Sequence, residues 1–160
     1  MQHLWAPWRM AYVGVEQPQG CIFCVKPAED RDAENYLVHR GKHAFVMLNA
    51  FPYSSGHLLI APYRHTADFT GLSEEELLEL MQLAQQGITV LQRVYRPEGC
   101  NLGMNLGRVA GAGIAEHLHL HVVPRWGGDT NFMTVVADTR VLPEALADSY
   151  RRLREGWEAL

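Results

Sequence analysis

The sequence predicts an α+β domain built on one antiparallel sheet of about five strands, covered by one long helix and followed by a C-terminal helix. Short β-favouring segments are separated by short turns, and the helical patterns are grouped instead of alternating with the strands. The chain has 160 residues, of which nearly half are apolar, so one domain spanning residues 1–160 can bury a sizeable core.

The strands are predicted where apolar and β-branched residues lie between turn residues. In chain order they cover residues 36–39, 44–48, 57–62, 101–107 and 117–126, with a further short strand at 132–136. Gly41-Lys42 predicts the hairpin turn between the first two strands. Residues 26–34 are charged and rich in structure-breaking residues, which predicts an exposed loop.

Two helices are predicted, one in the middle of the chain and one at its end. Ser73 and Glu76 form a capping-box pattern at the start of the first, and Pro97 ends it after about 20 residues. The stripe expected to cover the sheet consists of Leu77, Leu80, Met81, Ala84, Ile88, Leu91 and Val94. Pro143 is expected in the first position of the C-terminal helix. Its apolar stripe consists of Leu146, Tyr150, Leu153 and Trp157.

The composition limits the partners and the compartment of the protein. The formal net charge of -4 argues against a general nucleic-acid-binding protein, which needs a basic surface to displace counterions from phosphates. No apolar run approaches the roughly 20 residues needed to cross a bilayer, and the first residues lack the apolar core of a signal peptide. Together with the three cysteines, these features predict a cytoplasmic protein without membrane contact.

Three histidines alternate with apolar residues in the segment that begins at residue 117. In a strand, alternate side chains face the same side, so His117, His119 and His121 are expected on one face. Leu118 and Leu120 would then enter the core from the other face. A row of groups that titrate near neutral pH is costly unless it binds metal or performs chemistry. The alternation therefore predicts a catalytic or metal-binding surface.

The His-x-His-x-His pattern, followed by two apolar residues, resembles the motif of the histidine triad nucleotide-binding superfamily. Residues 48–53 and 56–62 extend the resemblance upstream. The downstream residues that resemble the bacterial diadenosine-polyphosphate branch are Pro124, Arg125, Trp126, Gly128, Asp129, Asn131 and Phe132. The resemblance covers most of a core at 21–135, between an N-terminal arm at 1–20 and a C-terminal helical segment at 136–160. It implies an enzyme that cleaves dinucleoside polyphosphates such as diadenosine tetraphosphate.

The resemblance assigns catalytic roles to three histidines. His119 would be the nucleophile that forms a nucleotidyl-histidine intermediate, and neutral imidazole suits this role near pH 7. His121 and His57 would orient the nucleophile and supply charge near the leaving oxygens. From the residues alone, His57 could instead be a buried structural histidine.

A second group of residues is expected to bind the nucleotide. Its members are Asn49, Phe51, Asn105, Gly111, Gly113 and Ile114. Residues 111–114 belong to a glycine-rich turn, whose backbone N–H groups can approach phosphate oxygens closely. The resemblance places Asn105 near the phosphates and Asn49 at the ribose hydroxyls. Phe51 and Tyr53 are candidates for the walls of a base pocket, although packing within their loop would explain them equally well.

Cys21 and Cys24 have the two-residue spacing of half a structural zinc site. The sequence alone leaves several histidines as candidates for the other ligands, and the resemblance to superfamily members implies His65 and His117. Two buried structural thiols without metal are the alternative.

Several questions stay open at the level of sequence. The triad histidines could together bind one metal in a metal-dependent enzyme, or the chain could be a non-catalytic nucleotide-binding module. In the proposed enzyme, either water or inorganic phosphate could resolve the intermediate, and the resemblance favours phosphate. The superfamily also implies a homodimer. The 73–95 helix is expected at its interface, because Leu78, Leu83 and Val90 lie outside the predicted sheet-facing stripe.

Overall fold

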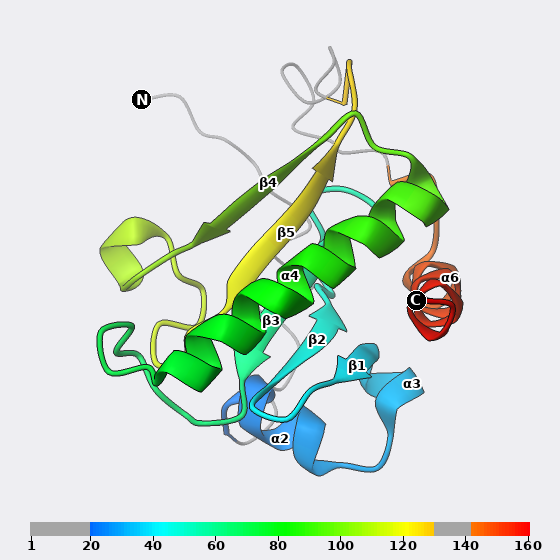
Figure 1. Ribbon diagram of the computed structural model, residues 1–160. Coiled ribbons are helices and arrows are strands. Elements are labelled where there is room, and N and C mark those ends of the chain that lie inside the picture. The colour runs from blue at the N-terminus through cyan, green and yellow to red at the C-terminus, as the bar shows by residue number, and fades with distance from the viewer. Residues whose placement is uncertain (1–19, 130–141) are drawn as a thin grey trace.

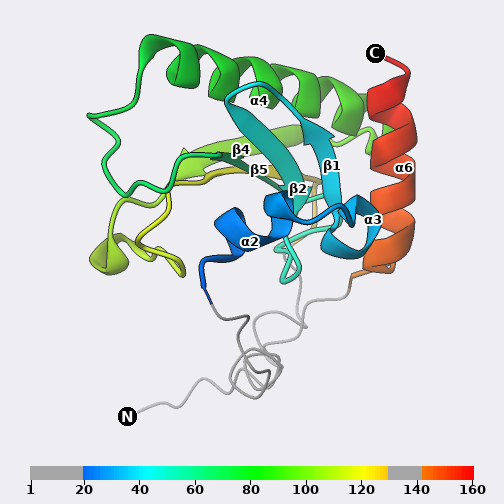
Figure 2. The same ribbon diagram turned by 90° about the horizontal axis from the view of Figure 1, so that it is seen from below.

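The computed structural model describes residues 20–129 and 142–160 and confirms the α+β class, with a five-stranded antiparallel sheet. The elements in chain order are α2 (Ile22–Ala28), α3 (Asp32–Asn35), β1 (Leu37–Arg40), β2 (Ala44–Leu48), β3 (Leu58–Pro62), α4 (Glu74–Tyr95), β4 (Gly99–Met104), the 3-10 turn η1 (Arg108–Ala110), β5 (Leu120–Arg125) and α6 (Leu146–Glu158). Helix α4 runs diagonally across one face of the sheet (Figure 1). Helices α2 and α3 lie on the opposite side (Figure 2).

The strand order β1-β2-β3-β5-β4 inserts the histidine strand between β3 and β4. Sequential neighbours β1, β2 and β3 pair through short connections, whereas β4 and β5 pair across the glycine-rich turn. The β4–β5 ladder extends from Gly99 opposite Arg125 to Met104 opposite Leu120. This order places side chains from β3, β4 and β5 next to one another on the face away from α4.

Both faces of the sheet are buried around β2. Ala44, Val46 and Leu48 point into the main core beneath α4, and Phe45 and Met47 point into a second cluster with Phe23. A strand covered on both faces has a continuous apolar sequence instead of an alternating one, and residues 44–48 show that pattern. The second cluster forms the floor on which α2 packs.

Helix α4 begins as predicted but turns a different stripe toward the sheet. Ser73 caps it, and the reciprocal bonds between Ser73 and Glu76 complete the capping box. Leu80, Ala84 and Leu91 are buried as expected. Leu83 and Val90 are also buried, whereas Leu77 and Met81 are 36% and 51% exposed. The predicted stripe was therefore wrong at its edges, because near-continuous apolar residues allow two overlapping helical faces.

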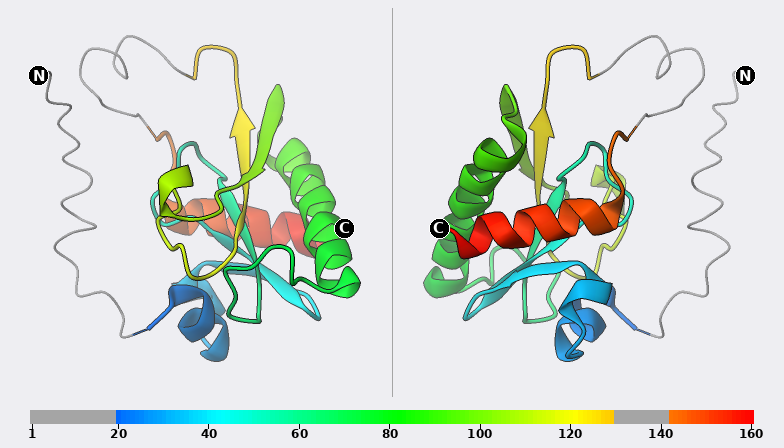
Figure 3. Two further views of the ribbon diagram at one scale, coloured as in Figure 1. Left: turned by 90° about the vertical axis from the view of Figure 1, so that its left-hand side faces the viewer. Right: turned by 90° about the vertical axis from the view of Figure 1, so that its right-hand side faces the viewer.

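Helix α6 starts later than predicted. Its N-cap is Ala145, so Pro143 precedes the helix instead of occupying its first position. Leu153 and Trp157 join the main core as expected, and Leu146 is only half-buried. The helix packs beside β1, and its C-terminal end lies against α4 (Figure 3).

The segment at 26–34 contains no buried residue, as the predicted exposure requires, but the prediction of a loop was wrong, because α2 and α3 cover much of the segment. Pro27 lies within α2, and Phe23 anchors the helix in the second cluster at 1% exposure. Strand β4 starts two residues earlier and ends three residues earlier than the predicted 101–107. The predicted strand at 132–136 and nearly all of the predicted arm at 1–20 lie outside the described residues. Within the described ranges, no helix is both long and apolar enough to cross a membrane.

Candidate active site and metal site

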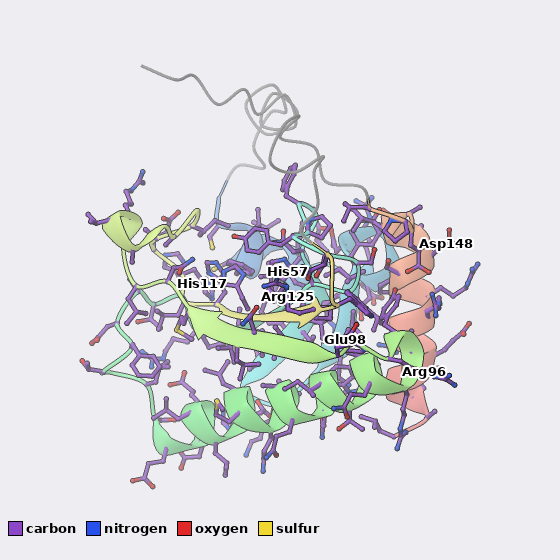
Figure 4. The ribbon with its side chains drawn as sticks, turned by 90° about the horizontal axis from the view of Figure 1, so that it is seen from above. His57, Arg96, Glu98, His117, Arg125 and Asp148 are labelled. Carbon is purple, nitrogen blue, oxygen red and sulfur yellow. The ribbon has the colours of Figure 1, made fainter. Side chains whose placement is uncertain are left out.

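The triad histidines lie on the sheet face opposite α4. His117 and His119 precede β5 and His121 belongs to it, while Leu118 and Leu120 enter the main core. Figure 4 shows His57, His117 and Arg125 on this face, with α4 on the other side of the sheet. The alternation expected from the sequence is therefore present, although the assigned strand starts only at Leu120.

A backbone carbonyl determines the tautomer of His119. Its Nδ1 lies 2.9 Å from the carbonyl oxygen of His117, and a carbonyl only accepts, so Nδ1–H donates. In the neutral ring the lone pair is then on Nε2. Burial lowers the pKa of His119, while the bond to the carbonyl opposes that shift. The side chain, 6% exposed, packs against the ring of Phe23 with centroids 4.8 Å apart. It is a neutral imidazole in a fixed orientation.

His57 and His121 form a directed hydrogen-bond chain. The backbone N–H of Tyr53 donates to Nδ1 of His57 at 3.1 Å, so the neutral ring carries its proton on Nε2. That Nε2–H faces Nδ1 of His121 at 2.9 Å, which leaves the proton of His121 on its own Nε2. Burial and, second, the neighbouring His119 lower the pKa of His121 to about 4. The chain therefore ends in a neutral N–H donor at His121.

The asparagine expected at the ribose, Asn49, contacts His57 in this structure. Asn49 Nδ2 lies 3.3 Å from Nδ1 of His57, and its Oδ1 accepts from the backbone N–H of Phe51 at 2.9 Å. Phe51 is 41% exposed, and the ring of Tyr53 lies 4.5 Å from that of His57. The loop thus supports His57 directly.

The glycine-rich turn reaches the same region from the other side. Gly107 and Gly111 flank η1 with φ of +85° and +95°, a left-handed conformation that favours glycine. Ile114 packs against the Phe23 cluster, and Asn105 lines a cleft together with His121. Gly113 lies one residue before Ile114, with nothing within 4 Å of the position its Cβ would take.

A separate cluster at the start of the histidine run has the donors of a metal site. Cys21, Cys24, His65 and His117 each offer one ligand atom, and these atoms all lie within 4.8 Å of one another. Nδ1 of His117 lies 3.3 Å from Cys21 Sγ, and Nδ1 of His65 lies 3.3 Å from Cys24 Sγ. A tetrahedral zinc ion separates its sulfur and nitrogen ligands by about 3.5 Å. The donor set and spacing fit zinc.

A backbone carbonyl also orients His117. Its Nε2–H donates to the carbonyl of Pro62 at 2.8 Å, which leaves the Nδ1 lone pair toward the cysteines. One shared metal on all three triad histidines is not favoured, because Nδ1 of His117 faces sulfur and Nδ1–H of His119 is engaged by a carbonyl. The described geometry groups His117 with the cysteines and His121 with His57.

Sequence reasoning missed several residues that shape the site. Phe23 packs against both His117 and His119, and its only signal was its place between two cysteines. The cleft next to His121 also has walls from Ser55, Tyr95 and Arg152, which no motif indicated. These positions become neighbours only through the tertiary fold.

Comparison with known proteins identifies similar chains. Residues 30–128 match the model of the HIT domain. The AP-4-A phosphorylase of Mycobacterium tuberculosis is 41% identical over 165 residues, which cover 98% of this chain and 85% of that protein. The similarity to this protein therefore extends beyond residue 128 into α6.

Solved structures share the fold. A zinc-bound histidine triad family protein from Mycobacterium smegmatis aligns with a TM-score of 0.71 at 27% identity, covering 88% of this chain and 94% of that one. The diadenosine triphosphate hydrolase of Plasmodium falciparum aligns with a TM-score of 0.64 at 15% identity, covering 82% of this chain and 79% of that one. The second match bears on the fold alone.

Proposed function

This chain belongs to the histidine triad (HIT) family, and we propose that it cleaves dinucleoside polyphosphates through a nucleotidyl intermediate on His119. The observation that carries this proposal is the tautomer of His119, because its Nδ1–H is engaged by the His117 carbonyl and leaves Nε2 as a nucleophile. A buried, neutral and oriented imidazole meets the requirements for attack on phosphorus.

In the first step, Nε2 of His119 forms a bond to the α-phosphorus as the bond to the bridging oxygen breaks. The leaving nucleoside polyphosphate takes the electron pair of that bond, and its stability as an anion reduces the need for a general acid. The His57–His121 chain places an Nε2–H donor beside the nucleophile, where it can stabilise phosphoryl oxygens. Asn105 and the turn at 111–114 supply further donors for the phosphates, and Asn49 and Phe51 contact the nucleoside.

In the second step, an acceptor oxygen attacks the phosphorus and the P–N bond breaks, which restores the neutral histidine. We assign inorganic phosphate as the acceptor, supported by the 41% identity with a protein named AP-4-A phosphorylase. The experiment is incubation with diadenosine tetraphosphate with and without phosphate, followed by separation of products. Phosphorolysis yields ADP and ATP, whereas hydrolysis yields AMP and ATP. Absence of turnover under both conditions would favour a non-catalytic nucleotide-binding module.

Zinc at Cys21, Cys24, His65 and His117 is part of the proposal. The spacing of the donors supports it, as does the zinc-bound relative of known structure. The ion would tie α2 to the start of the histidine run and the loop after β3, which stabilises the fold without entering the reaction. Cys21 and Cys24 are not joined by a disulfide, which also suits a reducing compartment, and we propose a cytoplasmic enzyme.

We further propose a homodimer in which α4 lies at the interface. Leu83 and Val90 belong to the core, so the exposed apolar set is Leu77, Leu78 and Met81, at 36%, 60% and 51% exposure. Leu78→Glu should shift the mass in sedimentation equilibrium from two chains to one. Gln86→Glu adds charge at another exposed position of α4 and should leave the dimer intact. A wild-type mass of one chain at micromolar concentration would contradict the dimer.

A further inference from the structure

A cleft of about 700 Å³ opens on the histidine face beyond His121. Its walls come from β4, β5, the loop at 53–55, the residues 142–144 that precede α6, and Arg152 on α6. Volumes of this size hold small organic ligands. The HIT-domain match ends at residue 128, so the wall supplied by 142–144 and Arg152 lies outside that domain.

The floor of the cleft next to His121 is open. Gly103 lies opposite His121 in the β4–β5 ladder, and residues directly opposite in such a ladder face the same side. A Cβ added at Gly103 would meet nothing within 4 Å. A side chain at this position would therefore project into the space beside the last donor of the His57–His121 chain.

Two buried polar atoms line the cleft without a hydrogen-bond partner among the described residues. They are Nε2 of His121 and Oγ of Ser55. A buried donor without a partner costs about 1 to 3 kcal/mol, so such groups are normally satisfied by water or ligand. Both atoms are available to a polar molecule that enters the cleft.

The charges in the cleft are balanced. Arg125 forms a bidentate pair with Asp129, at 2.5 and 2.8 Å, and its third contact is Asn101 Oδ1 at 2.9 Å. Arg152 pairs with Glu144 at 2.7 Å, and its guanidinium lies 4.6 Å from the centre of the Tyr95 ring. Paired arginines attract a polyphosphate chain weakly. A neutral nucleoside fits this lining better, because carboxylates accept hydrogen bonds from hydroxyls, and the walls also contain amides and aromatic rings.

We propose that this cleft holds the second nucleoside of the two-headed substrate, while its phosphate chain bridges the cleft and His119. The inference rests on the proposed function and adds to it a site for the leaving half. It predicts that the enzyme recognises both ends of a dinucleoside polyphosphate. Adenosine tetraphosphate, which has the same phosphate chain but lacks the second nucleoside, should be a poorer substrate.

The test places a new side chain on the floor of the cleft. Gly103→Val adds a side chain beside His121, and Gly99→Val makes the same change four residues away on the same strand and face, also with nothing within 4 Å. For each protein, kcat/KM is measured with diadenosine tetraphosphate and with adenosine tetraphosphate. Wild type should prefer the dinucleotide by about tenfold or more. Gly103→Val should remove most of that preference, and Gly99→Val should change it less than about twofold.

The outcomes separate the two proposals. Cleavage of neither substrate by wild type would reject the proposed function itself. Cleavage of both without preference, or equal losses for both substrates in Gly103→Val, would reject the cleft as a nucleoside site while the function stands. If Gly103→Val does not fold, Arg152→Ala replaces it, with its exposed neighbour Arg151→Ala as the control. The preference should then fall in Arg152→Ala only, and an unchanged preference would reject the inference.

Discussion

His117 and His119 are two residues apart on the same face of the sheet, yet the structure prepares them for different chemistry. A carbonyl from the end of β3 takes Nε2–H of His117 and leaves Nδ1 toward two thiols. The carbonyl of His117 takes Nδ1–H of His119 and leaves Nε2 as the basic nitrogen. In the proposed mechanism, the same type of side chain is a metal ligand in one case and a nucleophile in the other. The deciding factor is which ring nitrogen a backbone carbonyl occupies.

The two ends of the histidine run should therefore respond to mutation in different ways. His119→Ala should lower turnover of diadenosine tetraphosphate by at least about a thousandfold, because it removes the proposed nucleophile. Nucleotide binding, measured by calorimetry, should persist because the walls of the site remain. Turnover within tenfold of wild type would contradict the role of His119.

Mutation of the proposed zinc site should instead lower the stability of the fold. Cys24→Ser should abolish stoichiometric zinc and lower the melting temperature by about 10 °C, because a closed zinc site contributes directly to folding free energy. Cys100→Ser is the matched control, since Cys100 is a half-buried free thiol on β4 outside the cluster. Zinc content by metal analysis and melting by calorimetry test both variants. A metal-free wild type of full stability would reject the zinc site.

The hydrogen-bond chain that ends at His121 can be tested with a side chain that preserves its direction. His57→Gln can still accept from the Tyr53 N–H and donate to His121, whereas His57→Leu can do neither. We expect His57→Leu to lose about a hundredfold in kcat and His57→Gln about tenfold. Equal losses in the two variants would show that His57 acts by packing alone.

The low pKa of His121 predicts a smaller, pH-dependent effect on stability. Since burial keeps the folded pKa at about 4 while the unfolded chain titrates near the usual 6.5, the unfolded state binds more protons between these values. The contribution is fully present above pH 6.5 and is lost as the pH falls toward 4, by about 2 to 3 kcal/mol. Urea unfolding from pH 7 to 4.5 should show a shallower loss for His121→Gln. Parallel curves would contradict the shift.

Local patterns predicted most of the fold. The capping box at Ser73 and the alternation around His119 involve residues close in sequence, so their geometry follows from the backbone. The buried stripe of α4 and the start of α6 depend on packing against other elements. The sequence therefore placed Leu83 outside the buried stripe and Pro143 inside the helix, whereas Leu83 is buried and Pro143 precedes α6. The helix at 22–28 was missed because Pro27 and the charges after it resemble a loop.

The sequence predicted which candidate site residues would lie together, but not which ring nitrogen of each histidine carries the proton. The family resemblance indicated the candidate metal donors and the triad histidines, and the structure brings Cys21, Cys24, His65 and His117 together. The tautomers depend on carbonyls, one of them from Pro62 far away in sequence. The cleft depends on Gly103 and on Arg152 beyond the matched domain. Neither the tautomers nor the cleft can be predicted until distant segments are placed side by side.

Direct detection of the intermediate tests nucleophilic attack by His119 most directly. The protein is mixed with diadenosine tetraphosphate without phosphate, quenched at alkaline pH to preserve a P–N bond, digested and analysed by mass spectrometry. The peptide that contains His119 should gain the mass of one adenylyl group, which is AMP less one water, with release of one ATP per site, and the adduct should be absent from His119→Ala. Release of ATP without an adduct, or an adduct on another residue, would contradict nucleophilic attack by His119.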